Sequence, residues 1–485
     1  MGFQGLVVSD WNSIGELVIK GVANDGATAA RKAFLAGVDM DMVSSLYHDN
    51  LQALVSSRQI PPAAIDESVR HVLRVKLALG LLEHPYVDEA AAPKALYRPE
   101  SVALAQTAAE RSFVLLKNAS RPQGKPLLPL SEGTQNFALI GPVGEDSSYP
   151  NGPPPGSGPR TGLLAALVAR LGNEHVARYK GSGILDGTDQ DIAEAVAGSR
   201  KADVSILALG ESPDMSAEAA SRAHLGLPGR QEELLEAIVN TGKPVILILF
   251  SGRPLTLPWA FQHVPAIIAA WLPGMSGGPA LVRTLFGDVN PSGKLVVSWP
   301  RSVGQEPLYY NSNNTGRPPA GTDLTHPPSN IEERYVSRYI DEQNAPQFPF
   351  GYGLSYTTFT YVATKISADH LSAGELTRTL AAKTSPVLTA KADVSNTGSR
   401  PANELVEMYV RLQGTSTEQP VRALKGFQTI ALAPGETKTV KFDVAAESFA
   451  IWNDGNQLAV EPSKLTVWIA PDSAHGTPAQ AEIVP

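Results

Sequence analysis

The sequence predicts a mixed α/β protein that ends in a small β-sandwich. Three observations support this fold class. Residues 1–83 read as strand, helix, strand and helix with short connections, the unit of a parallel barrel or a doubly wound sheet. Strands and helices go on alternating as far as about residue 300. From about residue 356, strands with turn signals replace helices almost completely, which is typical of a β-sandwich.

Composition limits the classes of function. The chain has 485 residues, enough for two or three domains, and a net charge of −8 without a basic run, so neither nucleic acid nor a membrane is an expected partner. No apolar run is long enough to span a bilayer. There are no cysteines, and the nine histidines lack metal-ligand spacing, so we expect no metal and no other cofactor.

The first segment centres on the run Gly5-Leu6-Val7-Val8-Ser9-Asp10-Trp11. Its apolar residues predict a strand buried on both faces, as in a parallel sheet. Asp10 would then lie at the carboxyl end of this strand, where parallel β/α folds build their active sites. Two interpretations remain open: Asp10 attacks a sugar carbon beside the Trp11 indole, or it caps the next helix.

The rest of this segment repeats the pattern. Residues 37–42 predict a second short strand, and we interpret Asp39 and Asp41 as strand-end caps rather than metal ligands. Pro61-Pro62 opens a longer helix. Its expected buried face consists of Ile65, Val69, Val72, Leu73 and Leu77.

After a linker, a second α/β domain with a mostly parallel sheet is expected. The clearest strands are residues 113–116, 137–140, 204–209, 245–250, 266–271 and 294–298. The clearest helices are residues 163–171, 189–197, 231–239 and 280–286. Two long loops interrupt the pattern: residues 145–160, which cannot be regular, and residues 302–350, which we expect to be functional or to wrap another domain.

Two glutamates follow the strand at 204–209. Glu211 comes directly after it, and Glu218 lies farther along an extended loop. Met215 and neighbouring alanines could provide apolar surroundings that keep Glu218 protonated, as a general acid requires. The alternative is a solvated glutamate paired with Arg222.

A serine esterase is a competing interpretation. Gly274-Met275-Ser276-Gly277-Gly278 fits the nucleophile-elbow pattern, and Asp288 and His326 follow in a suitable order. No oxyanion-hole motif of the His-Gly-Gly-Gly type precedes it. We otherwise interpret these glycines as a tight strand-to-helix turn.

Several longer motifs occur together in this chain. They are Val7-Val8-Ser9-Asp10-Trp11, Ser13-Ile14-Gly15-Glu16, Ala36-Gly37-Val38-Asp39-Met40, Arg70-His71-Val72-Leu73-Arg74-Val75-Lys76, Val114-Leu115-Leu116-Lys117-Asn118, Met215-Ser216-Ala217-Glu218-Ala219-Ala220-Ser221-Arg222, Phe286-Gly287-Asp288-Val289-Asn290-Pro291-Ser292-Gly293-Lys294-Leu295, Pro349-Phe350-Gly351-Tyr352-Gly353-Leu354-Ser355-Tyr356, Leu424-Lys425-Gly426-Phe427 and Leu432-Ala433-Pro434-Gly435-Glu436. Over essentially the whole chain, they resemble glycoside hydrolase family 3, and within it the periplasmic bacterial β-glucosidases.

The resemblance implies a domain order. Residues 1–83 would be the C-terminal part of a (β/α)8 glycosidase barrel, and residues 84–100 a linker. Residues 101–355 would form the α/β sandwich domain of the family. Residues 356–485 would form a fibronectin type III-like domain.

The resemblance also implies chemistry: a retaining exo-β-glucosidase that acts through a glycosyl-enzyme on β-linked oligosaccharides or aryl and alkyl β-glucosides. Asp10 would be the nucleophile and Glu218 the acid/base, with Glu16 and Glu211 as alternates. Retention needs the two carboxyl groups roughly 5–5.5 Å apart. Trp11 would stack on the sugar, and Met215 and Ser216 complete the expected substrate-binding residues.

The resemblance departs from the family in one respect. Most of the barrel, with the residues that hold the glucose hydroxyls, is absent before Asp10, as is a signal peptide. We therefore expect this chain alone to be weak or inactive, and its exposed barrel remnant to favour a homo-oligomer. A periplasmic or secreted location is implied. A β-xylosidase and a non-catalytic carbohydrate-binding or assembly fragment remain as alternatives.

Overall fold

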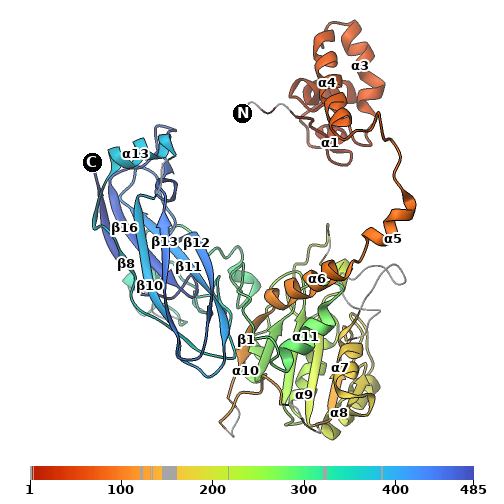
Figure 1. Cartoon of the computed structure of the whole chain (residues 1–485), viewed down its shortest axis with the longest axis vertical. Helices are drawn as coiled ribbons and strands as arrows, with labels where there is room; N and C mark the ends of the chain where they lie inside the picture. Colours follow the sequence, from red (N-terminus) through yellow and green to blue (C-terminus); the bar gives the residue numbers. More distant parts are fainter. Residues whose placement is uncertain are drawn as a thin grey trace. The chain divides into compact units, whose positions relative to one another are not determined.

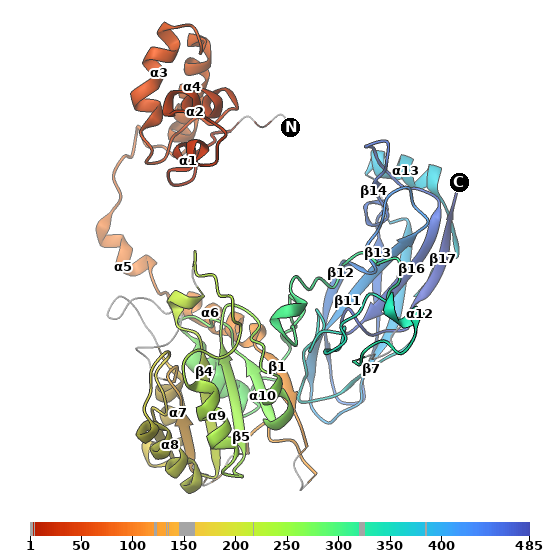
Figure 2. The same cartoon turned by 180° about the vertical axis from the view of Figure 1, so that it is seen from behind.

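The computed structural model describes residue 3 and residues 5–120, 124–131, 133, 135–144, 161–216, 218–319, 325–383 and 386–485. The chain divides into two compact units, Met1–Leu96 and Tyr97–Pro485 (Figures 1 and 2). Within the described ranges, no helix is both long enough and apolar enough to cross a bilayer. The loop predicted at residues 145–160 lies outside these ranges, so its irregularity stays a prediction.

The first unit is mainly helical. Its helices are α1 (Ser13–Ile19), α2 (Gly26–Leu35), α3 (Leu46–Ser56) and α4 (Pro62–Ala78), followed by a short η1 (Glu89–Ala91) and α5 (Ala92–Ala95). Asp25 caps α2 by accepting a hydrogen bond from the Thr28 amide at 2.7 Å. The small core includes Phe34 and Tyr47, whose rings meet edge to face with centroids 5.4 Å apart.

The predicted buried strand before Asp10 is wrong. Val8 pairs with Met40 in a single parallel bridge, and the side chains of Val7 and Val8 are 36% and 41% exposed. The physical reason is local: the described part of this unit supplies one parallel neighbour and no layer that covers both faces. The predicted second strand at residues 37–42 likewise shrinks to this one bridge.

The predicted buried face of α4 forms only in part: Ile65 packs against the small core and Val72 is half-buried, but the other three residues are exposed. Val69, Leu73 and Leu77 are 48%, 46% and 55% exposed, although residues four apart share one face of a helix. Ser68 is the buried residue of this helix, and its hydroxyl donates to the carbonyl of Asp39 at 3.1 Å. The helix therefore packs against the unit through Ile65 and Ser68, and the described residues of the unit leave Val69, Leu73 and Leu77 uncovered.

The second unit begins with α6 (Pro99–Ser112) and a six-stranded sheet in the order β1-β6-β5-β4-β2-β3. All neighbours are parallel except β1 and β6, which confirms the predicted mostly parallel sheet. The strands are β1 (Val114–Asn118), β2 (Phe137–Ile140), β3 (Val176–Tyr179), β4 (Val204–Gly210), β5 (Val245–Phe250) and β6 (Ala266–Ala269).

Helices cover both faces of this sheet because successive strand residues point to opposite sides. One core joins the sheet to α6, α7 (Leu163–Leu171) and α11 (Gly277–Leu285). The other joins it to α8 (Asp189–Lys201), α9 (Gln231–Val239) and α10 (Pro258–His263). Figure 1 shows α6 and α11 in front of the sheet. In Figure 2, the view from the opposite side, α9 lies in front of it.

Residues 294–298 form no strand, contrary to the prediction. The Leu295 backbone instead pairs with an incoming loop, because its amide donates to Tyr352 O at 2.8 Å and its carbonyl accepts from the Gly351 amide at 2.7 Å. Val296 is 75% exposed. The predicted strand at residues 266–271 ends early, since Trp271 adopts a left-handed backbone with φ of 56°.

The end of the chain is a β-sandwich, as predicted. One sheet contains β7 (Phe359–Tyr361), β8 (Lys365–Ile366), β10 (Leu388–Asn396) and β13 (Thr437–Val444). The other has the order β12-β11-β16-β17-β9. Its strands are β12 (Ala423–Leu432), β11 (Ala402–Gln413), β16 (Ser463–Ala470), β17 (Ala479–Val484) and β9 (His370–Ser372). A hairpin of β14 (Ile451–Trp452) and β15 (Leu458–Ala459) and one helix, α13 (Ala373–Ala382), are added to it.

The described part of the long loop at residues 302–350 wraps this sandwich, as predicted. The Tyr310 ring stacks on Phe350 at 4.2 Å between centroids and meets Tyr409 of β11 edge on. The Val421 amide donates to the Ser312 carbonyl at 3.0 Å. The loop thus ties the sheet domain to the sandwich.

Candidate active site

Asp10 lies in the first unit, directly after the Val8–Met40 bridge. Two further contacts hold this turn: the Ser9 amide donates to Met40 O at 2.9 Å, and the Ser9 hydroxyl accepts from the Met42 amide at 2.8 Å. The Asp10 carboxylate is exposed and accepts one hydrogen bond, from the Trp11 amide at 2.7 Å. One carboxylate oxygen is therefore oriented by the backbone, while the group stays accessible.

The two neighbouring aspartates act as caps, as the sequence analysis interpreted them. Asp39 accepts from the Val7 amide at 3.0 Å and contacts His71 Nδ1 at 3.1 Å. Asp41 accepts from the Ser44 hydroxyl at 2.6 Å. Asp39 therefore links the backbone just before Asp10 to His71 of α4, and His71 helps to hold this turn in place. The sequence motif around His71 did not reveal this role.

The other predicted residues of this unit lie at the surface. The Trp11 side chain is 69% exposed and is free to serve as a platform. Glu16, on α1, pairs with Lys20 at 2.7 Å across one helical turn. The assignments of Asp10, Trp11 and Glu16 remain predictions.

In the second unit, the carboxyl ends of β4, β5 and β6 carry the polar residues, as expected for an open parallel sheet. Glu211 follows β4 and is completely buried, at 0% exposure. It accepts hydrogen bonds from Ser216, Arg222 and, at 2.8 Å, Ser251. Arg253 Nε lies 3.3 Å from the same carboxylate.

This environment disfavours Glu211 as the alternate general acid, because it favours the charged form of the carboxylate. Burial alone would raise its pKa, but the hydrogen bonds from Ser216, Arg222 and Ser251 and the charge of Arg253 outweigh burial and leave the pKa below its usual value. A carboxylate that is charged and sealed from solvent has no proton to donate to a substrate. The alternative that paired Arg222 with Glu218 is wrong for the same reason, because the guanidinium is bound to Glu211.

Glu218 is exposed, and no described residue pairs with its carboxylate. Ser216 donates to Glu211 and accepts from the Gly252 amide at 3.0 Å, so its hydroxyl is engaged inside the loop. The Met215 carbonyl accepts from Arg253 Nη2 at 2.5 Å. The structure thus gives Met215 and Ser216 a part in holding the loop, and their contact with substrate stays a prediction.

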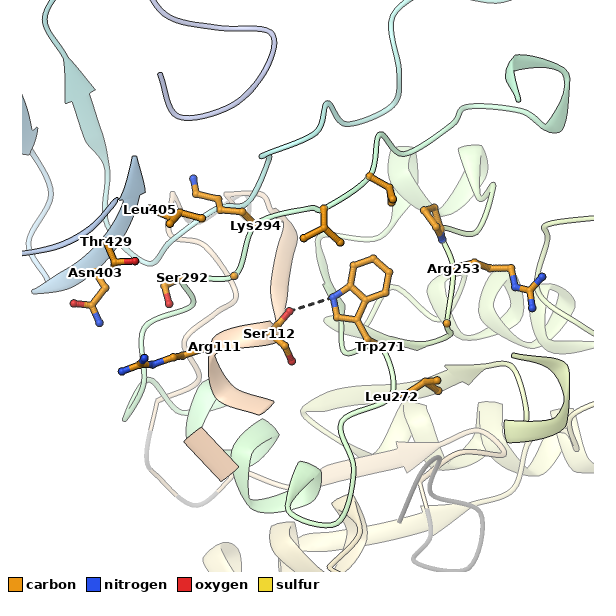
Figure 3. A pocket seen from close by; sticks show the side chains of 15 residues that line it. Arg111, Ser112, Arg253, Trp271, Leu272, Ser292, Lys294, Asn403, Leu405 and Thr429 are labelled. Carbon is orange, nitrogen blue, oxygen red and sulfur yellow. Dashed lines mark hydrogen bonds between the residues drawn. The ribbon is translucent and has the colours of Figure 1, made fainter. Parts of the chain in front are cut away.

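A cleft of about 1020 Å³ opens beside this cluster (Figure 3). Arg253 and Trp271, from the ends of β5 and β6, line it together with Lys294, and the sandwich contributes Asn403 and Leu405. The Trp271 indole donates to the Ser112 carbonyl at 3.1 Å, which fixes its orientation. The cleft therefore combines an aromatic ring, apolar side chains and cations next to the Glu218 loop.

The serine esterase interpretation is wrong. Ser276 is buried and lies at the turn before α11, with its hydroxyl 3.4 Å from the Val102 carbonyl. Asp288 is bound by Arg170 at 2.6 and 3.1 Å, and His326 Nδ1 contacts the Pro327 carbonyl at 2.8 Å. None of the three contacts another, so no triad forms.

Comparison with known proteins identifies the family. Residues 1–75 match the N-terminal domain of glycosyl hydrolase family 3, and residues 113–356 match its C-terminal domain. The chain belongs to glycosyl hydrolase family 3. Residues 404–473 match a fibronectin type III-like domain, which agrees with the sandwich in both position and fold.

Two relatives of this chain carry different enzyme names. It is 38% identical to a periplasmic β-glucosidase of Salmonella typhimurium, over 98% of the chain and 62% of the relative. It is 33% identical to a β-xylosidase of Formosa agariphila, over 98% of the chain and 64% of the relative. The chain therefore spans less than two thirds of the length of these relatives.

A solved structure of the family agrees with the fold. A β-glucosidase from Listeria innocua in complex with glucose matches with a TM-score of 0.87 and 32% sequence identity. The match covers 100% of this chain and 63% of that protein. The three relatives described above are named β-glucosidase or β-xylosidase.

Proposed function

We propose that this chain carries the reacting carboxylates of a retaining exo-β-glucosidase. The observation that carries the proposal is the contrast between exposed and engaged carboxylates. Asp10 stands exposed with a single backbone hydrogen bond, in the segment that matches the family's N-terminal domain. Glu218 stands exposed on an anchored loop of the C-terminal domain, whereas the nearby Glu211 is engaged by four side chains.

In this mechanism the Asp10 carboxylate attacks the anomeric carbon of a terminal β-D-glucosyl residue and forms an ester with it. Glu218 donates a proton to the departing glycosidic oxygen and then removes one from the water that hydrolyses the ester. Both steps use carboxylates alone, so no cofactor takes part. The Trp11 ring supplies an apolar surface for the sugar face.

The nucleophile is tested by trapping. A 2-deoxy-2-fluoro-β-glucoside with a good leaving group should leave a glucosyl adduct on the peptide that contains Asp10, detected by mass spectrometry. Asp10→Asn should lose the adduct and reduce aryl β-glucoside hydrolysis at least a hundredfold, because an amide cannot form the ester. Asp66→Asn, an exposed aspartate of the same unit, is the matched control. An adduct on another side chain would refute the assignment.

The acid is tested through the leaving group. Glu218→Gln should slow hydrolysis of phenyl β-glucoside far more than that of 2,4-dinitrophenyl β-glucoside, because the second leaving group departs without protonation. Equal losses would contradict the assignment of Glu218.

A β-xylosidase is the second candidate, favoured by the Formosa relative of that name. The ratio of kcat/KM for aryl β-glucoside to that for aryl β-xyloside separates the two, and a value above one supports the glucosidase. Glycan binding without any turnover would support the non-catalytic fragment instead. The periplasmic Salmonella relative supports a periplasmic location, which fractionation of the native host would test.

A further inference from the structure

Glu211 joins three segments of the second unit at one buried carboxylate. It follows β4, it binds Ser216 and Arg222 of the loop beyond it, and it binds Ser251 at the end of β5. Arg253 adds a second guanidinium, with Nε 3.3 Å from the carboxylate. The Arg222 and Arg253 side chains are themselves only 15% and 24% exposed.

The two arginines of this cluster also donate hydrogen bonds to the loop backbone on both sides of Glu218. Arg253 Nη2 donates to the Met215 carbonyl at 2.5 Å on one side and to the Ala220 carbonyl at 2.8 Å on the other. Arg222 Nη2 donates to the Gly226 carbonyl at 3.0 Å farther along. The loop is therefore tied down before and after Glu218, while Glu218 itself faces solvent.

The backbone beside Glu218 is strained. Ala219 has φ of 59°, a left-handed conformation that a residue with a Cβ adopts at an energetic cost. Such a conformation persists only where the surroundings fix it, and it recurs at catalytic loops. The contact of Arg253 with the adjacent Ala220 carbonyl is such a constraint.

The charge balance explains why a carboxylate is needed at the centre. A neutral side chain at position 211 would leave two partly buried guanidiniums without their shared anion, which is strongly unfavourable. Arg222 and Arg253 would then turn toward water, and the carbonyls of Met215 and Ala220 would lose their donor.

We propose that Glu211 is a positioning residue that holds the Glu218 loop in one conformation. It acts through Arg222 and Arg253 and touches no substrate. The proposal deepens the proposed function and rests on it for the chemical task of Glu218. The anchoring itself can be measured without any activity.

Proteolysis measures the anchoring. A glutamate-specific protease should cut wild-type protein slowly after Glu218, because cleavage requires the loop to detach. Glu211→Gln should accelerate this cut at least tenfold. The rate is measured by mass spectrometry, as the appearance of the fragment that begins at Ala219. Glu110→Gln is the matched control, since Glu110 is also buried and pairs with an arginine, Arg283, at 3.0 Å.

A second variant tests the anchoring independently of Glu211→Gln, in case that variant misfolds. Arg253→Lys keeps a positive charge but has a single nitrogen, so it cannot bind the two carbonyls and contact Glu211 from a separate atom as Nη2 and Nε do. It should therefore produce the same acceleration. Thermal unfolding of each variant checks that the fold is retained. A cleavage rate within twofold of wild type in both variants would overturn the proposal.

The leaving-group comparison distinguishes positioning from simple destabilisation. Glu211→Gln should lower kcat for phenyl β-glucoside at least tenfold more than kcat for the dinitrophenyl substrate, as expected when the acid is misplaced. A purely structural role would lower both rates equally and would overturn the proposal. If wild-type chain labels no Asp10 and hydrolyses neither substrate, the proposed function fails, while faster cleavage in the variants still establishes the anchor.

Discussion

Two glutamates near the end of β4 have opposite surroundings. Glu211 and Glu218 share a loop, and Arg222 is close in sequence to both, so the sequence allowed either pairing. In the structure, Ser251 and Arg253, which directly follow the neighbouring strand β5, also bind Glu211. Such a contact between residues that follow separate strands leaves no trace in local spacing, so the sequence could not show that Arg222 binds Glu211 instead of Glu218.

A third glutamate, Glu407 of β11, is buried in the sandwich. Burial raises its pKa to about 7, against the lowering effect of the Tyr409 hydroxyl at 2.5 Å and of Lys294, while Asp472 and Glu404 raise it further. Because the folded pKa lies above the ordinary value, the contribution of Glu407 to stability is complete below about pH 4.5 and is lost as the pH rises through about 7.

Glu407→Gln should therefore become relatively more stable as the pH rises. Between pH 5 and pH 8, the difference in unfolding free energy between variant and wild type should move by about 1–3 kcal/mol in favour of the variant. Urea titrations at several pH values measure it. Glu375→Gln, an exposed site on α13, should run parallel to wild type. Parallel curves for Glu407→Gln as well would contradict the burial argument.

At the scale of elements, Gly278 in the first turn of α11 serves packing rather than nucleophilic catalysis. A Cβ on Gly278 would lie 2.3 Å from the Gly162 carbonyl oxygen and 2.5 Å from that of Thr161. Helix α11 can therefore approach the segment before α7 only if this position lacks a side chain. The esterase-like pattern in the sequence reflects this close approach.

Gly278→Ala should destabilise the second unit by about 1–3 kcal/mol, because the added methyl forces backbone atoms apart. Gly374→Ala in α13 is the matched control, since its nearest atoms are 3.9 Å away. There the substitution should stabilise by up to about 1 kcal/mol through helix propensity. Chemical denaturation of both variants measures the difference, and an equal response would disprove the packing role of Gly278.

Elements with strong local patterns were predicted well. The helices at residues 163–171 and 231–239 and the strands at residues 137–140 and 245–250 have the expected bounds. Residues 294–298 looked equally like a strand, because their composition is apolar. Their backbone partners come from residues 351 and 352, and pairing with a loop cannot be distinguished from sheet pairing in the sequence.

At the scale of the whole molecule, the first unit exposes an apolar stripe. Val69, Leu73 and Leu77 lie on one face of α4 and are 46–55% exposed. Exposed apolar patches favour association, so we expect light scattering to show species larger than a monomer as concentration rises.

Leu73→Glu together with Leu77→Glu should shift the distribution toward monomer without loss of helical content by circular dichroism. Leu185→Glu adds a charge at an isolated exposed leucine of the second unit and should leave association unchanged. A monodisperse wild-type monomer at all concentrations would contradict the prediction.

The sequence by itself determined the family, the order of the sheet domain and the sandwich, and the carboxylates proposed for catalysis, because periodicity and contiguous motifs are local properties of the chain. Only the tertiary structure decided which carboxylates stay accessible. Glu211 is paired with arginines from the loops that follow β4 and β5, and Val7 and Val8 stay exposed because a parallel strand is buried only when neighbours cover it. Burial and charge pairing depend on residues far apart in the chain, and those contacts form only when it folds.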